Sequence, residues 1–217
     1  MTDETLIRLY RTADRQAVWD IACDTADRGK PIEDFFSDRK MAAEMLMRYY
    51  TDYEPHALWV AECEQKVVGY LSGCLDSARY SRVMAWRIMP GCLVRAVMSG
   101  LLWRRETMRM FKAGVKSILR GGLRRDMPFV DYPAHMHINL RDGYRGRHLG
   151  RRLIERFIEQ ARSERVKGIH ASVLEDNRPA GEFFSRAGFS VVRRYPVFLP
   201  NDNAASIHYT LIFGRKV

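Results

Sequence analysis

Hydrophobic and polar positions in the first third of the chain predict strands and helices in a fixed order. The apolar run at residues 6–10 predicts a strand, and apolar positions four apart then predict a helix that Thr12 caps. A second helix is predicted over residues 38–50. Apolar runs at 57–63 and 67–75, separated by a two-residue polar turn, predict a β-hairpin.

The last third of the chain continues the alternation of strands and helices. The predicted elements are a strand at 135–140, a helix at 149–164, a strand at 169–174, a helix at 179–187, and strands at 189–198 and 207–213. Pro179 suits the first turn of its helix, and Gly188 can end that helix in a left-handed conformation.

The order of these elements predicts an α/β fold. A mixed, mostly antiparallel sheet with helices on both faces accommodates them, and the strand, helix and strand over 135–174 form one parallel crossover. A long helical insertion separates the third and fourth strands. The chain has 217 residues and 47% hydrophobic content, which suits a single domain over 1–217.

The chain shows no targeting or membrane-spanning signal. It begins Met1-Thr2-Asp3-Glu4, without the basic start and apolar run of a secretory signal. No apolar stretch approaches the ~18 residues of a membrane span. The four cysteines lack C-x-x-C spacing, which predicts free thiols rather than disulfides or a zinc site. We therefore expect a cytoplasmic protein without an integral membrane segment and without a metal.

Positive charge is concentrated in one part of the chain. The net charge is +10, and residues 79–125 hold twelve Lys and Arg but one acid, Glu106. Segment 76–133 is predicted to be a basic, mainly helical insertion, interrupted near Gly100 or Gly114. Its apolar positions fall at helical spacing, and its basic positions fall on another face. The apolar positions are Val94, Val97, Leu101, Met108, Phe111, Val115 and Ile118. The basic positions are Arg105, Arg109, Lys112, Lys116 and Arg120.

Two interpretations of this insertion are open. It can be a helical cover that packs on the sheet and leaves its basic face in solvent. It can also be an electrostatic surface for an acidic acceptor, nucleic acid or an anionic membrane. Nucleic acid is the weakest of these, because no nucleic-acid-binding motif accompanies the charge.

The loop before the helix at 149 has the composition of an anion site. It reads Arg145-Gly146-Arg147-His148-Leu149-Gly150. The first amides of a helix lack intrahelical acceptors and, with the helix dipole, attract anions. The two glycines permit close approach to the backbone, and the arginines suit phosphate oxygens. The pattern is neither a Walker nor a Rossmann loop, so a diphosphate-bearing cofactor and a simple basic helix cap both remain open.

A second segment adds a family resemblance. It reads Asn177-Arg178-Pro179-Ala180-Gly181-Glu182-Phe183-Phe184-Ser185-Arg186-Ala187-Gly188-Phe189. The turn resembles the R/Q-x-x-G-x-G/A signature of the GNAT superfamily of N-acetyltransferases, and this segment resembles that family's N-x-x-A-x-x-F/L-Y-x-x-x-G-F motif. The resemblance is strongest over 133–198. Segments 71–76 and 134–138 also resemble the acetyltransferase-like domain associated with O-GlcNAcases and its free-standing bacterial relatives.

The resemblance implies a GNAT-like domain that uses acetyl-CoA and needs no metal. It places the pantetheine arm on the backbone of Ile138, Asn139 and Leu140, near Asn177 and Phe184. The pyrophosphate would bind the turn amides of Arg145, Gly146, Arg147, His148, Leu149 and Gly150. The chain departs from the pattern twice: His148 replaces a glycine, and Phe184 replaces a tyrosine that often protonates the leaving thiolate.

Direct attack of an amine on a thioester calls for a base and an acid. His135 and His137 share one face of their predicted strand, because side chains alternate along it, and His170 lies on the neighbouring strand. Histidine titrates in the range that suits amine deprotonation. We name His137 as the candidate base and Tyr195, ahead of Ser185 or a water, as the candidate acid. A structural role for each histidine remains open.

The sequence therefore predicts an acetyl-CoA-dependent N-acetyltransferase with an unidentified amine acceptor, for which an acidic molecule is one option. One alternative is a catalytically silent protein that binds acetyl-CoA. Another is an adaptor that binds an anionic surface through residues 79–125. We expect no nucleic-acid partner, and the oligomeric state, a homodimer included, stays open.

Overall fold

The structure is a computed structural model that describes residues 5–26, 29–34, 36–117, 119, 130–199 and 207–217. Within these residues one sheet has the strand order β1-β2-β3-β4-β5-β7-β6. Its strands are β1 (Thr5–Leu9), β2 (Leu58–Cys63), β3 (Lys66–Cys74), β4 (Ala134–Leu140), β5 (Gly168–Leu174), β6 (Ser190–Val197) and β7 (His208–Lys216).

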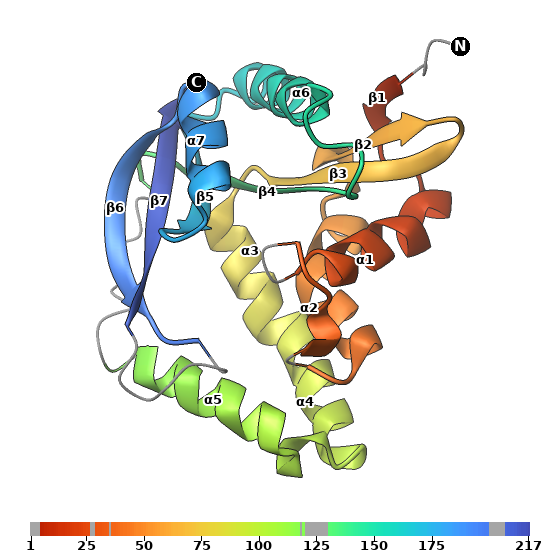
Figure 1. The fold of residues 1–217 in the computed structure, drawn as a ribbon, viewed down its shortest axis with the longest axis vertical. Helices are drawn as coiled ribbons and strands as arrows, with labels where there is room; N and C mark the ends of the chain where they lie inside the picture. Colours follow the sequence, from red (N-terminus) through yellow and green to blue (C-terminus); the bar gives the residue numbers. More distant parts are fainter. Residues whose placement is uncertain (1–4, 27–28, 35, 118, 120–129, 200–206) are drawn as a thin grey trace.

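Neighbouring strands of this sheet are antiparallel, except for the parallel pair β4 and β5. The helix α6 (Leu149–Ser163) connects these two strands and supplies the parallel crossover. The predicted α/β class, with a mixed and mostly antiparallel sheet, is confirmed (Figure 1).

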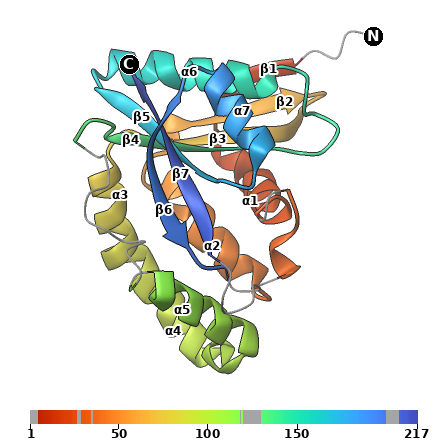
Figure 2. The same cartoon turned by 60° about the vertical axis from the view of Figure 1, so that its left-hand side comes forward.

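Helices cover both faces of the sheet (Figures 1 and 2). On one face α6 and α7 (Arg178–Arg186) close a core that includes Leu153 and Phe157, both fully buried. On the other face α1 (Arg15–Asp24) and α2 (Arg39–Asp52) close a second core around residues such as Ile21 and Tyr50. Burial of these apolar side chains, at about 25 cal/mol per Å² of surface removed from water, holds the layers together.

Local sequence signals account for several element boundaries. Glu64 and Gln65 both have positive φ, 48° and 61°, which matches the twist of a two-residue hairpin turn. Gly188 ends α7 with φ of 81°, as predicted. The prediction that Thr12 caps α1 is wrong. Thr12 instead opens a short 3-10 helix, η1 (Thr12–Asp14), whose last residue stands at the N-cap position of α1.

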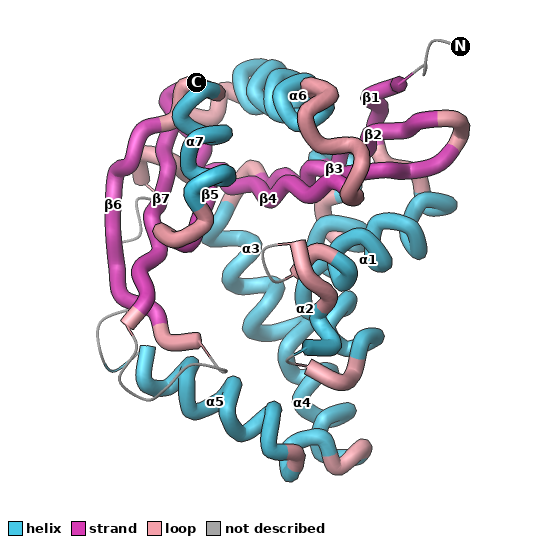
Figure 3. The backbone as a smooth tube through the Cα atoms, in the orientation of Figure 1, coloured by secondary structure: helices cyan, strands magenta, loops and turns pink. Residues whose placement is uncertain are grey.

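Between β3 and β4 the described residues form an arm of helices (Figure 3). We call residues 77–117 the arm. It contains α3 (Ser77–Val83), the π-helical turn η4 (Met84–Ile88), α4 (Met89–Met98), the 3-10 turn η5 (Leu101–Trp103) and α5 (Arg105–Ser117). Two further 3-10 turns, η2 (Ile32–Asp34) and η3 (Pro55–Ala57), lie elsewhere.

The arm is interrupted at Gly100, where φ is 67°, whereas Gly114 lies inside α5. Of its predicted helical positions, Ile118 and Arg120 lie outside the described residues. The chain runs away from the sheet through α3 and α4, and α5 returns toward the ends of β6 and β7 (Figures 1 and 2). There the Ser117 hydroxyl accepts a hydrogen bond of 2.9 Å from the Phe198 N–H.

The cover interpretation is wrong for α4 and α5, because their apolar rows are not buried. Val94, Val97 and Phe111 each expose more than half of their surface. The helix α3 contacts the sheet, where the ring of Tyr80 lies 4.7 Å from that of His135. The arm therefore presents both apolar and basic side chains to solvent.

Candidate active site

The parallel strands β4 and β5 separate soon after they meet. Their ladder comprises two residue pairs, Ala134 with Ile169 and His135 with His170. Figure 1 shows β4 continuing toward β3 while β5 turns with β6 and β7. Beyond His135 the backbone of β4 therefore forms no ladder with β5. Ile138, Asn139 and Leu140 thus lie beside the opening between the two strands.

The turn after β4 points unused amides toward the end of this opening. Gly146 and His148 both have left-handed backbones, with φ of 77° and 60°, and His148 is the N-cap residue of α6 without a side-chain cap. The first helical bond in α6 runs from the Arg152 N–H to the His148 carbonyl, 3.1 Å. Within the described residues, the amides of Leu149, Gly150 and Arg151 thus have no acceptor.

Basic side chains surround this helix end. Arg145 and Arg147 are exposed, as are Gly146 and His148. Arg145 pairs with Asp142 at 3.4 Å in a solvent-exposed ion pair, and Arg147 lies over the Tyr144 ring at 5.2 Å. Arg141, at the end of β4, pairs with Asp24 of α1. Unused amides, a helix dipole and mobile cationic side chains together fit a pyrophosphate group.

The two glycines of the turn have different structural roles. A Cβ on Gly146 would meet no atom within 4 Å, so its positive φ is what requires glycine there. A Cβ on Gly150 would lie 3.0 Å from the ring of Phe183. Gly150 therefore also makes room for α7, a role that the sequence pattern did not reveal.

The structure places Asn177 and Phe184 at positions with structural roles of their own. Asn177 is the N-cap of α7, and its side-chain oxygen accepts from the Ala180 N–H at 3.3 Å. Phe184 is 5% exposed and packs against the rings of Phe189 and Phe213. The neighbouring Phe183 is less buried and contacts the start of α6.

His135 is locked in a hydrogen-bond network. Ser77 Oγ donates to the Pro133 carbonyl at 2.7 Å, so it accepts from His135 Nδ1–H, also at 2.7 Å. His135 Nε2 then accepts from the Tyr50 hydroxyl at 2.9 Å. Burial, aided by the neighbouring His137 and His170, lowers the pKa of His135 well below its usual value and keeps the ring neutral. Tyr50, Ser77 and Pro133 were not singled out in the sequence as parts of this network; Tyr50 could have been found as one of the aromatic residues of α2.

His137 differs from His135 although it lies on the same face of β4. Its ring is exposed to solvent, and neither nitrogen has a hydrogen-bond partner among the described residues. The protein around the ring still disfavours the charged form and, with His170, lowers the pKa of His137. On β3 the residue opposite His137 is Ser72, whose fully buried hydroxyl has no hydrogen-bond partner within the described part of the chain.

A chain of contacts links His137 to Tyr195 on the same face of the sheet. The His135 ring lies 5.8 Å from His137 and 5.6 Å from His170. Ser172 follows His170 by two residues and so faces the same side of β5. Burial raises the pKa of Tyr195, although interactions of its side chain with Thr210 and Ser172 act to lower it. Tyr195 therefore keeps its proton at neutral pH.

The described residues offer neither a metal-ligand cluster nor a membrane-spanning helix. No cluster of three or more His, Cys, Asp or Glu side chains in the described ranges could hold a metal ion. No helix among the described residues is long and apolar enough to cross a membrane.

Comparisons with known proteins agree with this geometry. The sequence model of the Acetyltransferase (GNAT) family matches residues 127–189, which include the turn and the whole Asn177–Phe189 segment. The crystal structure of SsHAT is 26% identical, with a TM-score of 0.71 over 98% of each chain.

Two more distant structures share the fold. An N-acetyltransferase from Staphylococcus aureus Mu50 is 13% identical, with a TM-score of 0.59 over 98% of each chain. The protein yncA from Salmonella typhimurium, solved with its cofactor acetyl-CoA, is 15% identical, with a TM-score of 0.56 over 98% of this chain and 94% of that one.

The split parallel pair, the unused helix amides and these matches define the class: an α/β protein with the acetyltransferase fold. Residues 127–189 are similar to the GNAT acetyltransferase family, and the chain as a whole is similar in fold to solved acetyltransferases.

Proposed function

We propose that this protein is an acetyl-CoA-dependent N-acetyltransferase that moves an acetyl group to the amine of a small or macromolecular acceptor. The observation that carries the proposal is the separation of β4 and β5 beside the uncapped start of α6. An extended pantetheine arm fits along the free edge at Ile138, Asn139 and Leu140. The pyrophosphate fits the amides and cationic side chains from Arg145 to Gly150, and Phe183, rather than the more buried Phe184, borders this site.

The proposed reaction is a single displacement at the thioester. The amine nitrogen bonds to the carbonyl carbon while the bond from that carbon to sulfur breaks. His137 takes the proton from the amine, because its ring is neutral, accessible and not held by a hydrogen bond among the described residues. Tyr195 supplies a proton to the departing thiolate, a role for which Phe184 has no hydroxyl. Asn177 holds the start of α7 in place beside the pantetheine part of the cofactor.

Two further features are part of the proposal. A cytoplasmic location fits the four buried free thiols, since such cysteines persist in reducing compartments. A closer kinship with the acetyltransferase-like domain of O-GlcNAcases is supported by the sequences at 71–76 and 134–138.

The decisive experiment measures cofactor binding and transfer separately. Acetyl-CoA at 100 times its dissociation constant should stabilise the protein by about 2.7 kcal/mol in thermal unfolding. Arg145→Gln in the turn should weaken this binding, whereas Arg156→Gln, an exposed change on the helix α6 that follows the turn, should not. Thiol release with a panel of acidic, neutral and basic amines then reports transfer and identifies the acceptor class.

The outcomes separate the proposal from its alternatives. No stabilisation at millimolar acetyl-CoA would overturn it altogether. Stabilisation by acetyl-CoA without transfer to any amine of the panel would favour the catalytically silent binder.

A further inference from the structure

The helices α4 and α5 lie at the end of the molecule farthest from α6 (Figures 1 and 2), and this region exposes large apolar side chains to solvent. Trp86, Met98 and Trp103, at the two ends of α4, are 80%, 83% and 84% exposed. Leu93 and Val97 on α4 are more than half exposed. Soluble proteins rarely leave so many large apolar groups together without a binding purpose.

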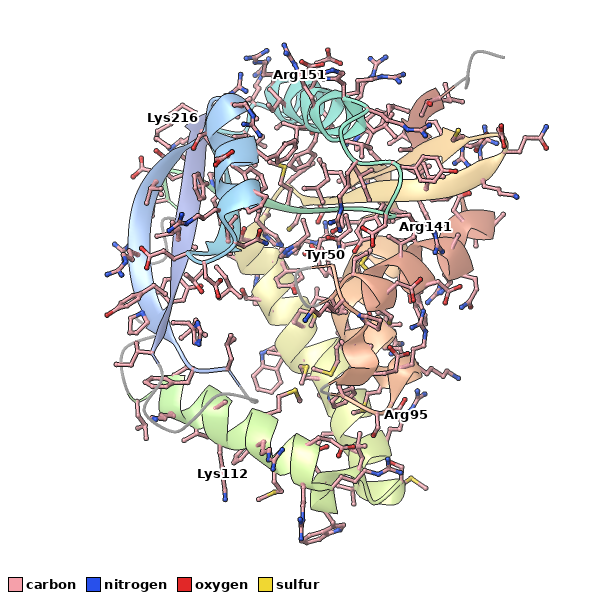
Figure 4. The ribbon with its side chains drawn as sticks, viewed as in Figure 1. Tyr50, Arg95, Lys112, Arg141, Arg151 and Lys216 are labelled. Atoms are coloured by element: carbon pink, nitrogen blue, oxygen red, sulfur yellow. The ribbon has the colours of Figure 1, made fainter. Side chains whose placement is uncertain are left out.

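The helix α5 adds a basic row beside an apolar row. Thr107 is buried and Met110 packs on the second core, so this side of α5 faces the protein. The exposed apolar residues Met108, Phe111 and Val115 are three or four apart. The same spacing holds for the basic residues Arg105, Arg109, Lys112 and Lys116. At 3.6 residues per turn, the basic row lies roughly 90° around the helix axis from the apolar row. Figure 4 shows Lys112 pointing away from the body of the molecule.

The two rows meet in a groove on α5. Phe111, Lys112, Val115, Lys116 and Leu119 line a volume of about 380 Å³. Lys116 also lies 4.2 Å from the ring centre of Phe198, which places its charge at the edge of the groove. Apolar walls with two ammonium groups suit a molecule that has an apolar tail and an anionic head.

Charge decides which kind of partner this surface fits. The arm holds nine Arg and Lys and one acid, Glu106. A second copy of the same surface would bring like charges together, which disfavours symmetric pairing. Nucleic acid would satisfy the charges but leave the apolar residues in water. An anionic lipid surface satisfies both, because phosphate headgroups attract Arg and Lys while Trp, Phe and Met enter the headgroup and acyl boundary.

We propose that the surface formed by η4, α4, η5 and α5 docks the protein on anionic phospholipid membranes. The helices lie on the bilayer and do not cross it, in keeping with the lack of a spanning helix among the described residues. The β4–β5 opening lies on the sheet, apart from this surface, so cofactor binding does not depend on docking (Figure 1).

Vesicle flotation tests the proposal with the full chain. The probe is phosphatidylcholine vesicles with about one-third phosphatidylglycerol, compared with pure phosphatidylcholine. We expect binding to the anionic vesicles alone, with a steep loss at high salt. Lys112→Gln with Lys116→Gln should weaken binding roughly 30-fold, at about tenfold for each 1.4 kcal/mol. Trp86→Ser with Trp103→Ser should weaken it comparably, because the apolar anchors are lost.

A matched control lies at the opposite end of the molecule. Arg156→Gln with Arg162→Gln on α6 removes the same charge as the lysine pair, away from the first turn of that helix, and should leave flotation unchanged. The thermal shift that acetyl-CoA produces in each variant verifies that the variant is folded. If acetyl-CoA produced no shift in any variant or in the unaltered protein, the proposed cofactor site would be wrong, and the docking result would stand.

Three results would overturn the proposal. One is no flotation with anionic vesicles at low salt. A second is a dimer in solution that the two tryptophan changes dissolve, which would assign the surface to a second copy of the chain. A third is binding to DNA that is as tight as binding to anionic vesicles and insensitive to the tryptophan changes.

Discussion

At the scale of single residues, His135 and His137 show how two residues with the same strand pattern receive different roles. Both point to one face of β4, as the alternation of side chains predicts. Tyr50 and Ser77 occupy both nitrogens of His135, so that ring supports the structure. The ring of His137 is open to solvent. The sequence could pair these histidines but could not tell which one is available, because Tyr50 and Ser77 come from distant segments.

His137→Gln tests the proposed base. The rate of transfer at pH 7 should fall by roughly 10²-fold or more, the usual contribution of a positioned base. The loss should shrink as the pH rises above the pKa of the acceptor amine, because the ammonium form then no longer has to lose a proton before the attack. Steady-state rates across the pH range provide the measurement, with the dissociation constant of acetyl-CoA unchanged.

His56 provides the matched control for this variant. It is exposed in the short turn η3, so His56→Gln should keep the full rate. A rate loss in His137→Gln that is the same at every pH would contradict the base role and indicate a positioning effect.

At the scale of elements, the turn between β4 and α6 combines sequence signals with a departure from the family pattern. Gly146 has the left-handed backbone that glycine favours, whereas His148 adopts the same region at a cost in strain. The turn keeps its form because histidine is among the residues that tolerate this region.

Two single changes test the strain in this turn. Gly146→Ala should destabilise the protein by about 1–2 kcal/mol, since a Cβ disfavours φ of 77° even in open space. His148→Gly should stabilise it by about 0.5–1 kcal/mol for the converse reason. Urea unfolding gives these values.

Gly91 provides the control of opposite sign. It lies in α4 with open space around its Cβ position and a helical backbone, so Gly91→Ala should stabilise by about 0.5–1 kcal/mol. Equal effects of Ala at Gly91 and Gly146 would show that backbone conformation does not matter at the turn.

At the scale of the whole molecule, three histidines from β4 and β5 meet where these strands join. His135 and His170 are buried, and burial is the main cause of the lowered pKa of each. His170 Nδ1 also forms a hydrogen bond of 2.8 Å with the Tyr132 carbonyl. A histidine whose pKa is lower in the folded than in the unfolded chain opposes folding in acid, because the unfolded chain then binds more protons.

The sign of this effect gives a prediction for the pH dependence of stability. Above the unfolded pKa of about 6.5 both states hold neutral histidines, and stability is complete. As the pH falls below 6.5, each of the two buried histidines should reduce stability with a slope of up to about 1.4 kcal/mol per pH unit. Urea midpoints across this range, with proton uptake measured on unfolding, test it.

Carboxylates do not produce the same signal in this range. The pKa values of Asp14 and Glu33 are lowered from 3.8 and 4.5. The stability that these two carboxylates contribute is therefore lost only as the pH falls below those values. A flat midpoint between neutral pH and pH 5 would show that the histidines are solvated in the folded state.

The sequence by itself determined the order of elements, the α/β class, the left-handed Gly188 and the two segments that resemble the GNAT motifs. Each of these depends on residues close together in the chain, where periodicity, glycine and proline act locally. The exact N-cap of α1 was missed because Asp14 accepts from the Arg11 N–H and from Arg8 of β1, contacts that the apolar pattern does not reveal.

Tertiary structure alone decided the separation of β4 from β5, the free amides facing that opening, and the choice between His135 and His137. It also decided that α4 and α5 leave their apolar rows in solvent, a question that the same helical pattern left open. These properties depend on which distant segments come into contact, and hydrophobic periodicity specifies that a face is apolar but not what, if anything, will cover it.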